Sequence, residues 1–277
     1  MKLKIGITGY NGVFGKKFIN LYRSNYIIYK FNGDITSKKD VKRWLNSKNF
    51  DCIIHAAAKV PIRYVNNNYK YSFKVNVLGT KNLFNNLLLL KKKCFFIFLS
   101  TAQVYPFSKK PISEKLKTKP ISKYGKTKFL AEKYLISKQN NFLDLSILRI
   151  FSYTDKKQSK EFFIPSIVSK IKYSKDYFVI DNLDQRRDFI HIKDLCGVIN
   201  HVIKYKLKGI INVGSGKSYK LNYIIKYFCK KFNKRIILNK KILKKKRNQD
   251  LFPNIGKLKR SGFKFKYNIK NILDDFI

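Results

Sequence analysis

The alternation of short β-branched runs with longer helical patterns is the feature that most restricts the folds open to this chain of 277 residues. Runs with the length and composition of strands lie at 3–8, 26–31, 52–55, 94–100 and 142–150. Helical patterns fall between them, near 13–23, 37–47, 70–90 and 122–139. This order predicts right-handed βαβ crossovers and an α/β fold, with a doubly wound parallel sheet covered by helices on both faces. Ligands of such sheets bind at the carboxyl ends of the strands.

The second half of the chain follows this alternation less closely. Beyond about residue 150 the patterns become shorter, and Pro165 and Gly216 interrupt them. We expect one domain from residues 1–154 and about 184–212, which would hold the sheet. Residues of about 155–183 and 213–277 would form a smaller C-terminal lobe over the sheet edge. A hydrophobic content of 44% is ample for a sizeable core.

The net charge of +45 raises the question of nucleic-acid partners, because basic surfaces attract phosphate backbones. Of the 61 basic residues, 52 are lysine and nine are arginine, although arginine matches phosphate and base edges better. The lysines are spread along the whole chain, together with residues encoded by A/T-rich codons. We interpret the densest run, KKILKKKR at 240–247, as a solvated segment, and we expect no nucleic-acid partner.

No feature of the sequence indicates a membrane span or a metal site. No stretch of 18 or more uncharged apolar residues occurs, and the N-terminus enters a strand-like pattern at once. We expect a soluble, cytoplasmic protein without membrane insertion. The four cysteines, Cys52, Cys94, Cys196 and Cys229, lie far apart and form no metal-binding pattern, which predicts reduced, buried thiols.

A glycine-rich segment, TGYNGVFG at 8–15, follows the first strand directly. Glycines between a strand and a helix let backbone N–H groups and the positive helix end approach a pyrophosphate. The segment therefore predicts a dinucleotide site of the Rossmann type. The expected cofactor contacts are Gly9, Asn11, Gly12, Val13, Phe14 and Gly15.

The end of the second strand bears on the choice between NAD and NADP. A site of the NAD type normally has an acidic residue there, to hold the ribose hydroxyls. This chain has Lys30, Phe31 and Asn32 instead, with Lys16 and Arg23 nearby. A 2′-phosphate would be tolerated better than usual, which favours NADP but leaves NAD open.

A hydroxyl group and a tyrosine–lysine pair form the candidate catalytic centre. Thr101 lies with Ser100 at the carboxyl end of the fourth strand, and Tyr124 and Lys128 begin the next helix. Residues four apart share one helix face, so the phenol and the ammonium can act on one point. Lowering the tyrosine pKa by about three needs roughly 4 kcal/mol, which the ammonium and a positively charged nicotinamide could supply. We expect hydride transfer coupled to proton transfer.

Ordered motifs along nearly the whole chain resemble the extended short-chain dehydrogenases/reductases, and specifically the NAD-dependent epimerase/dehydratase family that acts on nucleotide sugars. The motifs are TGYNGVFG at 8–15, GDI at 33–35, DCIIHAAA at 51–58, VNVLGTKNLF at 75–84, STAQVY at 100–105, YGKTK at 124–128, RRDFIHIKDL at 186–195, INVGSG at 211–216 and GKLKRSGFKFKYNIKNIL at 256–273.

The resemblance implies roles for individual residues. Thr101, Tyr124 and Lys128 would be catalytic, and the last two would also contact NAD or NADP. Further cofactor contacts would be Asp34, Ile35, Ala56, Ala57, Ala58 and Asn76. The substrate, a nucleotide sugar, would contact Thr101, Ala102, Gln103, Ser152 and Arg187. Asp188 and His191 have a structural alternative as hydrogen-bonded parts of their turn. Relatives commonly form homodimers through the helices near 70–90 and 122–139, so we expect a homodimer.

Two departures from the family pattern narrow the expected reaction. Related 4,6-dehydratases carry an Asp-Glu pair after the catalytic threonine, whereas this chain has Ala102 and Gln103, which exchange no proton. We therefore expect an epimerase or a ketoreductase, without deciding between them. Ser152 replaces an asparagine that helps to hold the substrate phosphate in epimerases. A non-catalytic RNA- or nucleotide-binding protein on the same fold is the alternative.

Overall fold

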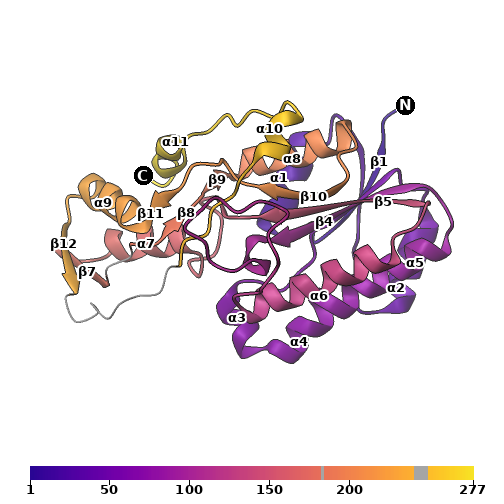
Figure 1. Ribbon diagram of the computed structural model, residues 1–277, viewed down its shortest axis with the longest axis horizontal. Helices are drawn as coiled ribbons and strands as arrows, with labels where there is room; N and C mark the ends of the chain where they lie inside the picture. Colours follow the sequence, from indigo (N-terminus) through magenta and orange to yellow (C-terminus); the bar gives the residue numbers. More distant parts are fainter. Residues whose placement is uncertain (182–183, 240–248) are drawn as a thin grey trace.

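Six parallel strands form one sheet at the centre of the molecule (Figure 1). The computed structural model describes residues 1–181, 184–239 and 249–277. The strands are β1 (Lys4–Thr8), β2 (Ile27–Lys30), β3 (Cys52–His55), β4 (Cys94–Thr101), β5 (Leu143–Ile150) and β10 (Gly209–Val213). The predicted parallel α/β sheet is confirmed, and the five expected strands lie within one residue of their expected bounds.

The strand order, β10-β5-β4-β3-β1-β2, reverses direction next to β1. From β1 the chain passes to β2 on one side, and later to β3, β4 and β5 on the other. The connections after β1 and β3 therefore leave toward opposite faces of the sheet. This reversal is where doubly wound sheets bind their ligands.

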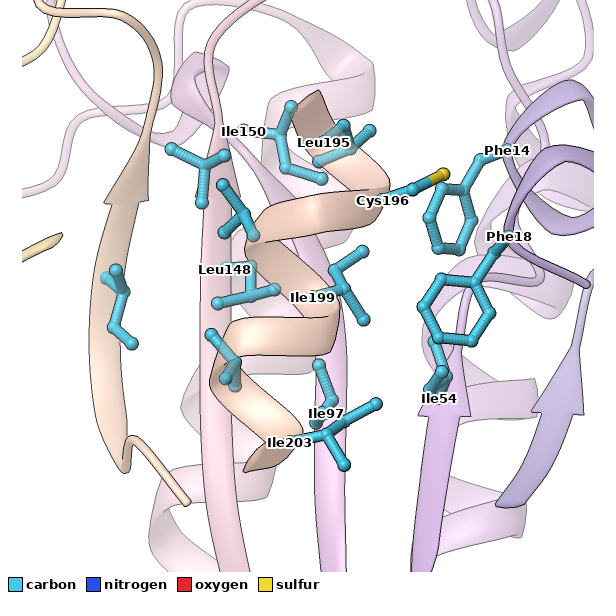
Figure 2. Close-up of a cluster of buried hydrophobic side chains, with 14 of the residues drawn as sticks. Phe14, Phe18, Ile54, Ile97, Leu148, Ile150, Leu195, Cys196, Ile199 and Ile203 are labelled. Carbon is cyan, nitrogen blue, oxygen red and sulfur yellow. The ribbon is translucent and has the colours of Figure 1, made fainter. Parts of the chain in front are cut away.

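Helices cover both faces of the sheet. Two of them, α1 (Val13–Tyr22) and α8 (Ile192–Lys204), share one buried cluster with the strands, whereas α2 (Lys38–Ser47), α5 (Thr80–Leu89) and α6 (Lys123–Lys138) belong to another. Figure 2 shows why α8 lies on the first face: Leu195, Ile199 and Ile203 recur at helical spacing and point toward the strands. The predicted two-faced covering of the sheet is confirmed.

The expected helix near 70–90 has three parts. They are α4 (Tyr69–Phe73), a π-helical turn (Lys74–Gly79) and α5, and the shorter α3 (Ile62–Asn67) precedes them. Gly79 accounts for the close packing of this turn, because a Cβ atom there would lie 2.7 Å from the side chain of Ile35. Single π-helical turns inside longer helices occur frequently at functional sites. This one contains Asn76.

Later elements build a smaller body beside the sheet, at the left of Figure 1. Its buried cluster joins α7 (Phe163–Lys172), α9 (Leu221–Lys231) and α11 (Ile269–Asp274) with β7 (Tyr177–Asp181), which pairs with β12 (Arg235–Asn239). Remaining elements are β6 (Tyr153–Thr154), β8 (Arg186–Arg187), β9 (Ile190–His191), β11 (Tyr219–Lys220), α10 (Gly256–Arg260) and a 3₁₀ turn (Ala102–Val104). The domain bounds expected from the sequence stay predictions.

Three further expectations concern the cysteines, the basic run and membrane spans. All four cysteines are free and buried, as predicted. The basic run at 240–247 lies outside the described residues. No helix within the described ranges is long and apolar enough to cross a membrane.

Truncating a leucine on the buried face of α8 tests the first cluster. Leu195 is fully buried, so Leu195→Ala should lower the free energy of unfolding by about 2–5 kcal/mol through lost burial and a cavity. The matched control is Leu89→Ala in α5, where the leucine is 78% exposed and the change should cost less than about 0.5 kcal/mol. Urea denaturation of both variants measures the difference, and equal losses would contradict the packing described.

Candidate active site

The turn between β1 and α1 is too crowded for side chains at two of its three glycines. A Cβ atom on Gly9 would lie 2.6 Å from the Ala57 nitrogen, and one on Gly15 would lie 2.6 Å from the Gly9 oxygen. Gly9 also has a φ of +70°, which glycine adopts without strain. At Gly12 a Cβ would meet only the Gly9 oxygen, at 3.3 Å. The turn therefore offers an open position without side chains at the start of α1.

The first turn of α1 has no side-chain cap. Its N-cap residue is Gly12, and no side chain accepts from the first N–H groups. Asn11 and Gly12 are exposed and Val13 is half-buried, whereas Phe14 lies in the core shown in Figure 2. Phe14 can therefore offer a ligand only its backbone. Free N–H groups at a helix start attract anions, so the loop suits the pyrophosphate predicted from the sequence.

Beneath the turn, a chain of buried hydrogen bonds joins β1, β3 and α5. The Thr80 hydroxyl donates to the Asn76 carbonyl (2.7 Å), so its oxygen accepts from His55 Nε2 (2.9 Å). His55 Nδ1 must then accept from the Thr8 hydroxyl (2.7 Å), whose oxygen accepts from the Ala57 N–H (3.2 Å). Burial, with a smaller effect of Lys128, lowers the pKa of His55 to about 3, so the ring is neutral. Sequence reasoning assigned His55 no role.

Asn76 also belongs to this buried framework. Its Oδ1 atom accepts from the Lys59 N–H (2.6 Å), and its Nδ2 atom donates to the Lys59 carbonyl and the Thr127 hydroxyl (both 3.2 Å). Thr127 in turn donates to the Tyr124 carbonyl (2.8 Å). The asparagine therefore links the segment after β3 to the helix that carries Tyr124. Its contact with a cofactor stays a prediction.

The residues after β2 carry no carboxylate at the position expected for NAD. The amine of Lys30, the last residue of β2, lies 5.7 Å from the ring centre of Tyr10 in the glycine-rich turn. The Tyr10 hydroxyl donates to the side chain of Asn32 (3.3 Å). A cation and two neutral polar groups therefore surround this end of the strand.

The other predicted cofactor contacts differ in exposure. Asp34 is exposed, and hydrogen bonds from Thr36 lower the pKa of its carboxyl. Ile35 is buried against the π-helical turn, so little of its side chain can reach a ligand. Three alanines after β3 are partly exposed: Ala56, Ala57 and Ala58. These contacts all stay predictions.

Hydrogen bonds through Gln103 join the end of β4 to the start of α6. The Thr101 hydroxyl accepts from the Gln103 N–H (3.3 Å), and the Gln103 carboxamide oxygen accepts from Ser122, the N-cap residue of α6. Gly125 packs so closely against Gln103 that a Cβ atom there would lie 2.3 Å from the backbone carbonyl oxygen of Gln103. Ala102 is fully buried. Gln103 thus holds the helix start, and the burial of Ala102 gives its predicted substrate contact no support.

Tyr124 and Lys128 lie on the first two turns of α6. The surroundings of both side chains favour the uncharged form. Burial, with a smaller effect of Tyr153, raises the pKa of Tyr124. Burial lowers the pKa of Lys128 to about 7. The expected lowering of the tyrosine pKa is therefore not produced by the chain's own groups, because desolvation opposes both charged forms.

The amine of Lys128 has no hydrogen-bond acceptor among the described residues, although the side chain is only 1% exposed. It lies 3.9 Å from the centre of the Phe98 ring, a cation–π contact. The Tyr124 hydroxyl also makes no hydrogen bond within the described ranges. The N–H donors of this amine are unused by the described residues, which is costly for a buried group unless a ligand accepts from them. This is the strongest indication of a ligand site.

Arg187 and Ser152 are the predicted substrate contacts farther along the chain. The Arg187 guanidinium donates to the carbonyls of Arg186 (2.8 Å) and Gln249 and to the Gln185 side chain (3.4 Å). Burial lowers the pKa of the guanidinium, and this effect outweighs that of the Asp250 carboxylate, which lies near enough to raise it. The Ser152 carbonyl accepts from the Ile190 N–H (2.9 Å), and its hydroxyl has no partner in the described part of the chain. Both side chains remain available for an anion, and both contacts stay predictions.

Asp188 and His191 have the structural roles given as their alternative. The Asp188 carboxylate accepts from Ser215 N–H (2.9 Å) and Gly216 N–H (2.7 Å), which fixes that turn. His191 is the N-cap residue of α8, and its Nε2 atom lies 2.7 Å from the Asp275 carboxylate. These residues hold the turn and the C-terminal segment.

The fold and these side chains together define an extended short-chain dehydrogenase/reductase, as the sequence motifs predicted. A sequence model described as GDP-mannose 4,6 dehydratase matches residues 16–262, and the chain belongs to this family of sugar dehydratases, epimerases and reductases.

Individual relatives span several of the family's reactions. GDP-6-deoxy-D-talose 4-dehydrogenase of Aggregatibacter actinomycetemcomitans is 30% identical over 237 residues, 82% of this chain and 79% of the relative. UDP-glucose 4-epimerase of Mycoplasma genitalium is 30% identical over 257 residues, 81% of this chain and 74% of the relative. The fold is similar to that of RMD from Pseudomonas aeruginosa complexed with NADPH, with a TM-score of 0.90, 19% identity, and 99% and 97% of the two chains covered.

Adding a methyl group at two glycines of the turn tests its crowding. Gly9→Ala should lower the free energy of unfolding by about 2–4 kcal/mol, because of the positive φ and the overlap with Ala57. Gly12→Ala should cost less than about 1 kcal/mol, since the added Cβ atom would meet only the Gly9 oxygen, at 3.3 Å. Chemical denaturation of the two variants provides the measurement. A larger loss at Gly12 than at Gly9 would contradict this geometry.

Proposed function

We propose that this chain is an NAD(P)-dependent enzyme that acts on a nucleotide-activated sugar, and that it works as a ketoreductase. The observation that carries the proposal is the buried amine of Lys128, which has no acceptor among the residues that the structure describes and lies one turn after Tyr124. An epimerase is the second candidate, because a 4-epimerase is 30% identical to the chain. Both activities use the same three side chains.

The residues at the β1–α1 turn suit a dinucleotide. Gly12 leaves the space that a pyrophosphate needs, and the uncapped N–H groups of α1 would donate to it. Lys128 would donate to a ribose hydroxyl. A bound nicotinamide supplies the hydride.

In the reductase direction, Tyr124 acts as the acid. Its raised pKa keeps the phenol protonated at neutral pH, which is the form that gives a proton to the carbonyl oxygen of a keto-sugar. Thr101 would donate a hydrogen bond to the same oxygen as its negative charge develops. Lys128 would stabilise the phenolate that remains.

NADP is the cofactor that the end of β2 supports. Lys30 lies beside Tyr10, and Asn32 takes the place of the acidic residue typical of NAD sites. A carboxylate there would repel a 2′-phosphate, whereas a lysine attracts it.

We further propose that the chain is not a 4,6-dehydratase, although its family model bears that name. Dehydration needs an additional acid and base beside the sugar. Ala102 is fully buried and Gln103 is bound to Ser122, and neither can exchange a proton. The cytoplasmic location also belongs to this proposal, and the four free cysteines are compatible with it.

Replacing the phenol tests the chemistry. With NADPH and nucleotide-linked 4-keto-6-deoxy sugars, Tyr124→Phe should lower kcat about 10²–10⁴-fold, because the acid is lost. Tyr173→Phe, at a tyrosine that is 77% exposed, is the matched control and should leave kcat unchanged. Absorbance of the reduced cofactor follows the reaction, and mass spectrometry identifies the product.

The possible products separate the candidates. A product that is heavier by two hydrogens supports the reductase, an isomer of equal mass supports the epimerase, and loss of water contradicts both. The binding-protein alternative predicts RNA affinity that falls steeply with salt and survives Tyr124→Phe.

A homodimer through α4, α5 and α6 is the assembly that we propose. Apolar side chains are exposed along α4, the π-helical turn and α6, including Tyr71 (50%), Leu78 (45%) and Ile136 (50%). Sedimentation equilibrium should give a dimer, and Ile136→Lys should shift it toward monomer because the contact would then bury an unpaired charge. A monomer at every concentration of the unmodified chain would exclude the assembly.

A further inference from the structure

The helix that carries Tyr124 and Lys128 continues to a buried carboxylate. Glu132 lies one turn after Lys128, and its side chain is 2% exposed. Arg149 of β5 reaches the same place with a side chain that is 5% exposed. Two buried basic side chains, Lys128 and Arg149, thus lie near one buried carboxylate, and it can pair with either.

Arg149 holds the carboxylate through several contacts. Its Nε atom lies 3.2 Å from Oε1 and 3.1 Å from Oε2 of Glu132, and its Nη2 atom lies 2.7 Å from Oε2. The Ser100 hydroxyl donates to Oε1 as well. The carboxylate oxygens of Glu132 therefore accept hydrogen bonds from Ser100 on β4 and Arg149 on β5. None of its hydrogen bonds goes to Lys128.

The guanidinium is itself fixed on its other side. Its central carbon lies 4.7 Å from the centre of the Tyr105 ring. The Tyr105 hydroxyl donates to Asn212 Oδ1 (2.9 Å), and Asn212 Nδ2 donates to the Ile112 carbonyl (2.8 Å). This chain of buried contacts extends to β10 and holds the guanidinium in place beside Glu132.

The titratable groups that interact with Lys128 among the described residues are Glu132 on its own helix and His55 on β3, which is neutral. Glu132 raises the pKa of the lysine, but burial outweighs this effect. A lysine and a glutamate four residues apart on a helix can pair, although the order with the lysine first is the weaker one. Here the carboxylate is bound by Arg149 instead.

We propose that Arg149 is a positioning residue that withholds Glu132 from Lys128, so that the amine stays available to Tyr124 and to bound ligand. For its effect on activity, this role rests on the proposed function. Were Glu132 to pair with the amine, its negative charge would cancel the field that favours a phenolate at Tyr124. It would also occupy donors that a ligand needs.

Three variants test this role: Arg149→Met, Glu132→Gln and the double variant. The direct readout is the pKa of Lys128, followed by NMR of 13Cε-labelled lysine, with Lys128→Met to assign the signal. Arg149→Met should raise the lysine pKa by about one, because Glu132 becomes free to pair with it. Adding Glu132→Gln should remove this increase. With NADPH and a keto-sugar, kcat/KM should fall roughly tenfold in Arg149→Met and recover in the double variant.

Specific outcomes would overturn the proposal. An equal lysine pKa in Arg149→Met and in the double variant would show that Arg149 does not act through Glu132. If Arg149→Met does not fold, Glu132→Gln and the double variant still decide, because both should have the same lysine pKa and the same kcat/KM. A further change on removing Arg149 from Glu132→Gln would reject the role. The titration needs no cofactor or sugar, so inactivity of the unmodified chain would reject only the proposed function.

Discussion

A backbone contact with no room for a side chain holds the candidate site together. At Gly9, where β1 ends, a Cβ atom would overlap the Ala57 nitrogen, so the ends of β1 and β3 can approach only at a glycine. The hydrogen bonds of Thr8 and His55 lie directly below this contact. The Thr8 hydroxyl bonds to His55 Nδ1 and to the Ala57 N–H, and His55 Nε2 bonds to Thr80. From there the buried framework continues through Asn76 to α6. Buried hydrogen bonds therefore join the glycine-rich turn to α6, the helix that carries Tyr124 and Lys128.

Much of the fold could be predicted from the sequence, because its signals are local. Five strands and the sheet class followed from β-branched runs at the right spacing, and the helix at 122–139 followed from its periodicity. The π-helical turn at Lys74–Gly79 could not be predicted, because it depends on how Ile35 packs against Gly79. Contacts between residues 44 positions apart leave no local pattern.

The candidate site was predictable to a lesser degree. Positions of Thr101, Tyr124 and Lys128 relative to the sheet edge followed from motif order, and the structure places them on β4 and α6. Their charge states did not follow, because a pKa depends on burial and on neighbours brought from other strands. Ser100 illustrates the difference. It was grouped with Thr101 at the strand tip, yet its hydroxyl turns to Glu132 inside the protein.

The surface charge and the buried charges obey different rules. With a net charge of +45, most lysines of this chain are solvated, and each contributes little beyond solubility. Lys128 differs because it is buried, and burial there lowers its pKa to about 7. A ligand oxygen that accepts from the ammonium favours the charged form of a buried amine and so raises its pKa again, and the ammonium in turn favours the phenolate of a neighbouring tyrosine. In the function that we propose, a bound ribose would thus prepare the tyrosine–lysine pair for proton transfer, which is a coupling that a surface lysine could not provide.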